Sequence, residues 1–231
     1  MSIFDPITNA ATARYNSTNY AVNEVLFGAG GGEGYTDGTY DAQVSVGETG
    51  VGPEVGVAYR TQNGFNTPAQ PYIQFVVNTT SLTIPDLTTA TASTGTATFY
   101  VKTYLASGYA VYTVGPPPTD AGGGHSFPST TSDFTSSPGT EQFGMNLVLN
   151  NTPSVGANPS QNPSNVYSFG NAYTGYNTAN NFKYTAGNEI AYSNQSTGET
   201  DYTISYLFNI STATPGGTYI FNQTLVATST Y

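Results

Sequence analysis

The stretch Thr94-Gly95-Thr96-Ala97-Thr98-Phe99-Tyr100-Val101-Lys102-Thr103-Tyr104-Leu105 decides the fold, because apolar and polar residues alternate along it. On one face of an extended chain lie Ala97, Phe99, Val101 and Leu105, and on the other lie Thr98, Tyr100, Lys102 and Tyr104. A period of two places the first set in a core and the second toward solvent or a partner. The stretch therefore predicts a half-buried β-strand.

The same kind of pattern recurs along most of the chain, in segments rich in Val, Ile, Thr, Tyr or Phe and bounded by Gly, Pro, Asn or Ser. The predicted strands are Tyr20 to Phe27, Tyr40 to Val46, Val55 to Thr61, Tyr72 to Asn78, Ser81 to Ile84, Thr94 to Leu105, Tyr109 to Val114, Phe143 to Asn150, Val166 to Phe169, Glu189 to Ser193, Thr200 to Ile210 and Thr218 to Thr228. About a dozen strands imply two sheets. The predicted fold class is all-β, a two-sheet antiparallel β-sandwich of jelly-roll type with long loops rich in Gly, Pro and Ser.

The last predicted strand differs from the others, because it carries apolar side chains on both faces. Tyr219, Phe221 and Leu225 alternate with Ile220 and Val226. A strand of this kind is usually central in its sheet, or is covered by a neighbouring chain.

The domain organisation follows from two long linkers and an N-terminal arm. The linkers Gly115 to Gly139 and Pro153 to Ser164 are exposed connections in composition, and we expect one domain, residues 20–231, to contain both. Residues 1–19 precede the first convincing strand and contain apolar Ile3, Phe4 and Ile7. Such an arm can complete another subunit's sheet as a donated strand, or it can be a frayed terminus.

The composition excludes several classes of partner. Only 8% of the 231 residues are charged, and 4 Lys and Arg against 14 Asp and Glu give a net charge of −10. Nucleic acids and anionic membranes require basic clusters, so neither is an expected partner. The chain has no stretch of about 18 apolar residues, so no membrane insertion is expected. The absence of cysteine excludes disulfides and thiolate chemistry.

Neither of two candidate catalytic features predicts an enzyme. His125 is the only histidine and follows Gly122-Gly123-Gly124, which is a poor platform for a catalytic base, so we expect it to be solvated in a loop. The glycine-rich run 28–34 is followed by another turn rather than a helix, so it predicts a hairpin loop and not a phosphate site.

Carboxylates are numerous enough to form a site. Asp37 and Asp41 flank a predicted turn, and Glu199 and Asp201 fall on the same side of a predicted strand. Calcium binds carboxylate oxygens in such settings, so these four residues are candidate ligands, with a solvated face as the alternative. A glycosidase pair could also be assembled from such residues, although the sequence does not select two partners.

Six N-x-[ST] sequons are candidate glycosylation sites. Their acceptors are Asn16, Asn78, Asn150, Asn194, Asn209 and Asn222. A chain rich in Asn, Ser and Thr also produces sequons by chance, so modification and coincidence both stay open.

Five blocks of the chain resemble a group of predicted secreted surface proteins from Patescibacteria, including Saccharibacteria. The blocks are STNYAVNEVLFG (17–28), GFNT (64–67) with PYI (71–73), KTYLASGY (102–109), PGTEQFG (138–144) and VATSTY (226–231). The resemblance carries over no catalytic residue. It implies export and a surface location, and because members of the group begin with a leader that this chain lacks, it implies a processed form.

Together these features predict a non-enzymatic, extracellular structural protein that binds copies of itself in a cell-surface fibre or surface layer. Subunits of extracellular fibres that complete each other by strand donation are an analogy at the level of fold only. The alternative is an adhesin or glycan-binding module that uses exposed tyrosines and calcium. A third hypothesis is a virion decoration or fibre protein.

Overall fold

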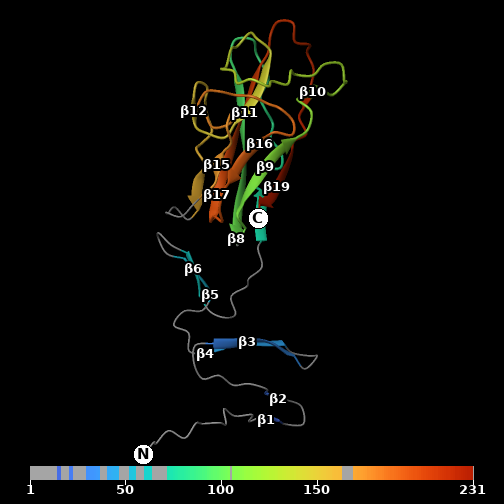
Figure 1. Cartoon of the computed structure of the whole chain (residues 1–231). Coiled ribbons are helices and arrows are strands. Elements are labelled where there is room, and N and C mark those ends of the chain that lie inside the picture. Colours follow the sequence, from blue (N-terminus) through green and yellow to red (C-terminus); the bar gives the residue numbers. More distant parts are fainter. Residues whose placement is uncertain are drawn as a thin grey trace, which may run out of the picture. The chain divides into compact units, whose positions relative to one another are not determined.

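The computed structural model (Figure 1) describes residues 15–16, 21–22, 30–36, 41–46, 52–55, 60–63, 72–104, 106–162 and 169–230. The chain divides into two compact units, residues 1–69 and residues 70–231. The second unit is called the β domain below. This division falls far from the predicted boundary between residues 19 and 20, and the arm residues Ile3, Phe4 and Ile7 lie outside the described residues.

The described strands of the first unit pair as three antiparallel hairpins, each formed by neighbours in sequence. They are β1 (Tyr15–Asn16) with β2 (Ala21–Val22), β3 (Gly30–Thr36) with β4 (Asp41–Val46), and β5 (Gly52–Val55) with β6 (Arg60–Asn63). The single strand predicted from Val55 to Thr61 is wrong. Val55 instead pairs with Arg60, so one strand ends and the next begins inside that segment.

The β domain contains two larger antiparallel sheets and two short strand pairs. The five-stranded sheet has the order β11-β17-β8-β7, with β14 also paired to β17; the four-stranded sheet has the order β15-β16-β9-β19. The strands of the two sheets are β7 (Tyr72–Val77), β8 (Ser93–Tyr104), β9 (Gly108–Val114), β11 (Gln142–Asn146), β14 (Ser160–Asn162), β15 (Asn171–Ala172), β16 (Glu189–Ser193), β17 (Glu199–Asn209) and β19 (Thr224–Thr230). The short pairs are β10 (Thr119–Asp120) with β18 (Tyr219–Ile220) and β12 (Asn150–Asn151) with β13 (Ser154–Val155).

The all-β class is confirmed for the described residues, none of which lies in a helix. Accordingly, this part of the chain contains no helix long and apolar enough to cross a membrane.

Strand β8 confirms the alternation that led to the fold prediction. Ala97, Phe99 and Val101 are buried, whereas Thr98 and Tyr100 between them are partly exposed. Leu105 lies outside the described residues. β8 pairs with β17 on one side and β7 on the other, so a long alternating strand occupies an interior position in its sheet.

Both larger sheets contribute side chains to one core, which includes Phe99, Val111, Ile190 and Tyr202. Phe99 stacks on Tyr202 within the five-stranded sheet, with ring centroids 4.9 Å apart. Between the sheets, the hydroxyl oxygens of Tyr109 (β9) and Tyr202 (β17) lie 2.8 Å apart. Burial raises the pKa of Tyr109 to about 12, so both hydroxyls are neutral at physiological pH.

Two further predicted strands need correction, and a third lies mostly outside the described residues. The segment Ser81 to Ile84 is not a strand, and Val166 to Phe169 has only Phe169 among the described residues, outside any strand. The segment Thr218 to Thr228 divides into β18 and β19 rather than forming one strand.

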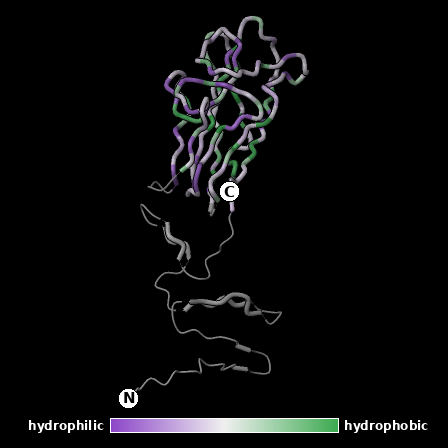
Figure 2. The backbone as a smooth tube through the Cα atoms, in the orientation of Figure 1, coloured by the Kyte–Doolittle hydropathy of each residue, from purple (hydrophilic) through white to green (hydrophobic). Residues whose placement is uncertain are grey.

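Of the two alternatives for this segment, the central position is wrong, because among the described strands β19 pairs only with β9 and forms an edge. Its side chains alternate between exposed and partly buried, and Val226 keeps 42% of its surface exposed. Figure 2 shows the hydrophobic residues of β9 and β19 next to each other at this side of the domain.

Candidate functional site

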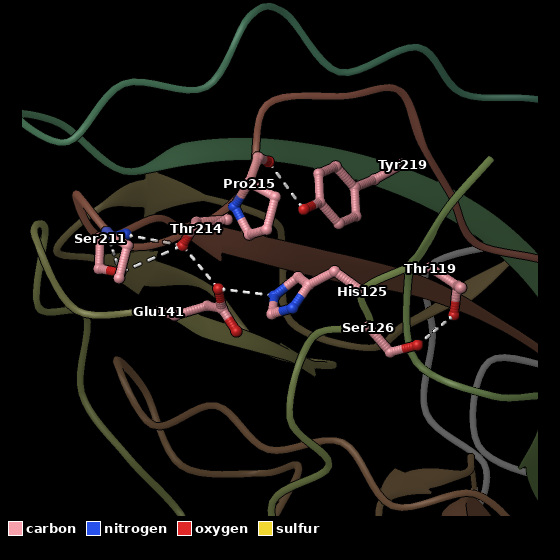
Figure 3. Close-up of polar contacts among 9 residues, drawn as sticks. Thr119, His125, Ser126, Glu141, Ser211, Thr214, Pro215 and Tyr219 are labelled. Atoms are coloured by element: carbon pink, nitrogen blue, oxygen red, sulfur yellow. Dashed lines mark hydrogen bonds and ion pairs between the residues drawn. The ribbon is translucent and has the colours of Figure 1, made fainter. Parts of the chain in front are cut away.

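A polar network joins three loops of the β domain (Figure 3). The Nε2 atom of His125 lies 2.9 Å from Oε2 of Glu141, and the Thr214 hydroxyl donates to the same carboxylate oxygen over 2.6 Å. The ring of Tyr219 meets the His125 ring edge-on, with centroids 6.0 Å apart. His125 is therefore not the solvated loop residue that its glycine neighbours suggested, because a carboxylate and an aromatic ring hold it.

The contacts of His125 and Thr214 with Glu141 tie the loops to one another, and these three residues are called the clamp below. Nucleophilic catalysis by a histidine requires a hydroxyl or thiol hydrogen-bonded to the imidazole. Here Thr214 donates to Glu141 instead, and the Thr119 hydroxyl bonds with Ser126, 2.8 Å away. The network thus links residues 119–126, residue 141 and residues 211–219, and its contacts supply positioning rather than an activated nucleophile.

The second predicted carboxylate pair lies as expected on one face of β17. Glu199 accepts a hydrogen bond from Asn162 on the neighbouring strand β14, over 2.8 Å. Burial raises the pKa of Asp201, and the charge of Glu199 adds to the rise. Among residues 72–103, 106–162 and 169–230, no three acidic or histidine side chains lie close enough together to hold a metal ion. Asp37 and the side chain of Asp41 lie outside the described residues, and calcium binding stays a prediction.

The six predicted glycosylation acceptors fall into different environments. Asn78, Asn194 and Asn222 are exposed. Asn150 and Asn209 are buried, so a glycan on either would have to displace packed neighbours. The side chain of Asn16 lies outside the described residues.

The burial of Asn150 has a structural reason. Its side-chain amide donates to the carbonyls of Val148 and Val155 and exchanges hydrogen bonds of 2.6 and 2.8 Å with the Asn146 amide. Its carbonyl oxygen also accepts from the backbone amide of Asn180. The side-chain oxygen and nitrogen of Asn150 are both thereby hydrogen-bonded, which fixes the shape of the loop.

Each of the two larger sheets has two edge strands, and the edge strands on one side of the domain differ from those on the other. On one side lie β15, with two residues, and β11, whose residue Met145 exchanges backbone hydrogen bonds with Lys183. On the other side lie β7, with six residues, and β19, with seven. The strands β7 and β19 approach each other with Cα atoms within 8 Å, yet among the described strands each is hydrogen-bonded to only one neighbour.

The edges β7 and β19 lack the features that usually protect a sheet edge. Neither strand contains a charged residue or a proline. The seven residues of β19 pair with β9 in unbroken register, so no bulge interrupts this edge. Proteins normally use charges, prolines or bulges to prevent edge strands from pairing with other chains. These two edges are therefore candidate sites of association.

A group of tyrosines lies on the outer face of the four-stranded sheet. Tyr173 and Tyr192 meet edge-on, with ring centroids 5.8 Å apart, and Tyr173 is 39% exposed. Tyr112 on β9 pairs with Glu189 on one side and Val226 on the other. Partial burial raises the pKa of the Glu189 carboxyl. This face offers aromatic rings beside one carboxylate.

The sequence contained a signal for the β19 edge, although not for the clamp. Apolar residues on both faces of the segment predicted either a central strand or a strand covered by a neighbouring chain, and the structure places β19 at an edge of its sheet rather than at the centre. Nothing local relates His125 to Glu141 or Thr214, because these residues are far apart in sequence and meet only through the loops.

No family model, curated protein or solved structure matches this chain.

Proposed function

We propose that this chain is an extracellular, non-enzymatic structural protein that assembles with copies of itself into a cell-surface fibre or surface layer. In this proposal the two larger sheets form a β-sandwich of jelly-roll type. The observation that carries the proposal is the pair of long, uncharged edges at β7 and β19. The resemblance to secreted surface proteins supports the location.

Electrostatics explains why assembly would use these edges. Two copies with a net charge of −10 each repel one another, and the repulsion is smallest where a surface has no charge. A neutral strand edge also loses no ionic hydration when it is covered, and each new backbone hydrogen bond contributes about 1 kcal/mol net. The edges β7 and β19 therefore combine low repulsion with an outer side that no other described strand pairs.

The N-terminal arm is the proposed link between successive subunits. Ile3, Phe4 and Ile7 would occupy an open sheet edge of a neighbouring copy, as in other complexes formed by strand addition. Deletion of residues 1–19 would then prevent the formation of long assemblies while leaving the β domain folded.

Electron microscopy tests this function. We expect filaments or sheets in concentrated purified protein and on native cells, and their loss after deletion of residues 1–19. Circular dichroism of the deleted chain is the control for folding. Isolated particles of single-chain size at every concentration, with no filament or sheet on native cells, would contradict the proposal.

A second candidate function, glycan binding, is favoured by the paired rings of Tyr173 and Tyr192 and by Tyr112, which lies opposite Glu189 in the same sheet. Aromatic faces stack on sugar rings, and a carboxylate accepts hydrogen bonds from sugar hydroxyls. A glycan array with and without chelator tests it, with Tyr192→Ala as the variant. Binding that Tyr192→Ala abolishes supports this function, and binding that chelator abolishes supports the calcium prediction. An array without signal removes the candidate.

A further inference from the structure

We propose that β19 forms an interface with β19 of a second copy, in which the two strands pair antiparallel about a two-fold axis at Ala227. The proposal rests on the proposed function, because it assumes that the chain associates with itself. It specifies one surface and one partner for that association. The edge β7 is left for other contacts, including the arm.

The first argument is the state of the edge. Seven consecutive residues of β19 pair with β9, so the strand is regular over about 23 Å. Thr224, Val226, Thr228 and Thr230 are exposed on its outer face. Regular strands of this length offer hydrogen-bonding groups along their free side to any strand of matching twist.

The second argument concerns the identity of the partner. The register that pairs all seven residues places Ala227 opposite itself, Val226 opposite Thr228, Leu225 opposite Ser229 and Thr224 opposite Thr230. Every pair is neutral, and apolar, small and Thr side chains meet without a clash of charge. The strand is thus complementary to its own copy, as a two-fold symmetric interface requires.

The third argument is continuity of the sheet. A two-fold axis perpendicular to the sheet keeps the outer faces of both copies on the same side, so two four-stranded sheets become one. Val226 would then lie between Tyr112 of its own chain and Thr228 of the partner. The valine that is 42% exposed in the single chain would gain a side-chain neighbour on its open side, which fits one of the two explanations of its sequence pattern.

Disulfide trapping tests the register directly, because the chain has no cysteine of its own. Val226→Cys and Thr228→Cys are made in separate full-length chains, mixed and mildly oxidised. In the proposed register these positions face each other with Cα atoms about 5 Å apart, within the range of a disulfide. Each variant alone would place its cysteines about 8 Å apart, which is too far. We expect a covalent dimer in the mixture and little in either variant alone.

A charge substitution provides an independent readout. Val226→Lys places a charge on the edge, and Val114→Lys is the matched control because Val114 is equally exposed, at 42%, but lies on the interior strand β9. We expect Val226→Lys to weaken dimerisation at least tenfold in sedimentation equilibrium and Val114→Lys to leave it within a factor of two.

Three outcomes would overturn the inference. Association without the mixed disulfide would show that another segment, such as the arm, covers β19, and the proposed function would stand. If Val226→Lys and Val114→Lys weakened dimerisation equally, the β19 interface would likewise be wrong, and the proposed function would stand. A chain that stays monomeric at all concentrations would contradict both the inference and the proposed function.

Discussion

At the scale of single residues, close packing around Gly170 holds the two larger sheets together. The backbone amide of Gly170 donates to the Thr200 hydroxyl over 2.8 Å, and the hydroxyls of Tyr109 and Tyr202 occupy the space beside its Cα. No side chain fits there, so the glycine is required for its size.

Replacing Gly170 by Ala should destabilise the domain by about 1–3 kcal/mol, because the added methyl group would push the paired tyrosines apart. Gly124→Ala is the control, since a methyl group there meets no atom within 4 Å. Urea denaturation of both variants measures the effect. Equal stability of the two would show that the Tyr109 and Tyr202 contact does not depend on this packing.

The pH dependence of folding stability should show the destabilising effect of the Asp201 carboxylate. Its pKa is raised in the folded protein, so the folded state binds this proton more tightly than the unfolded chain does. The ionised Asp201 carboxylate therefore destabilises the folded state. This loss of stability is complete above the raised pKa and disappears as the pH falls toward 3.8, the ordinary pKa of an aspartate. Asp201→Asn should therefore stabilise the protein at pH 7, by up to about 1 kcal/mol for a partly exposed charge, and should have less effect near pH 4.

Denaturation of the wild type, Asp201→Asn and Asp86→Asn at pH 7 and pH 4 measures this difference. Asp86 is exposed and serves as the control for the change in net charge. A gain at pH 7 that is the same for both variants would show that burial next to Glu199 is not the cause.

At the scale of elements, the clamp formed by His125, Glu141 and Thr214 should hold the loops in place. His125→Ala removes the contact with Glu141, and we expect a loss of about 1 kcal/mol, as for one hydrogen bond. Hydrogen exchange should become faster at residues 119–127 and stay unchanged in β8. Glu141→Gln keeps an acceptor for Thr214 and serves as the matched control. Unchanged exchange in the loops of His125→Ala would contradict the clamp.

The strands differ in how well the sequence predicted them, and the difference has a physical cause. Alternation in β8 and β17 reflects one buried face, so it was sufficient to locate both strands. The second half of β17 is buried on both faces, including Ser205 and Leu207, because a loop packs there: Gly156 lies against Ser205. No pattern within a strand records which loop will cover it.

The position of β19 shows the same limit. The sequence segment that contains it carries apolar residues on both faces, but sheet order depends on residues far away in the chain, so the sequence could not distinguish a central strand from an edge. The candidate site was predicted in part for the same reason: Glu199 and Asp201 share a strand, whereas His125 and Glu141 are brought together only by the fold.

At the scale of the whole molecule, scarcity of charge is the property that connects sequence, fold and proposed function. Charged residues make up 8% of the chain, and none lies on the β7 or β19 strand. Acidic repulsion is therefore spread over the remaining surface, and the unprotected edges are the places where we propose that copies meet.

The molar mass in solution, measured by light scattering over a hundredfold range of concentration, tests this account most directly. We predict a mass that rises above the 24.2 kDa of one chain as concentration increases, and that falls back toward one chain in Val226→Lys. A mass of 24.2 kDa at every concentration would contradict the claim that the chain assembles through its open edges.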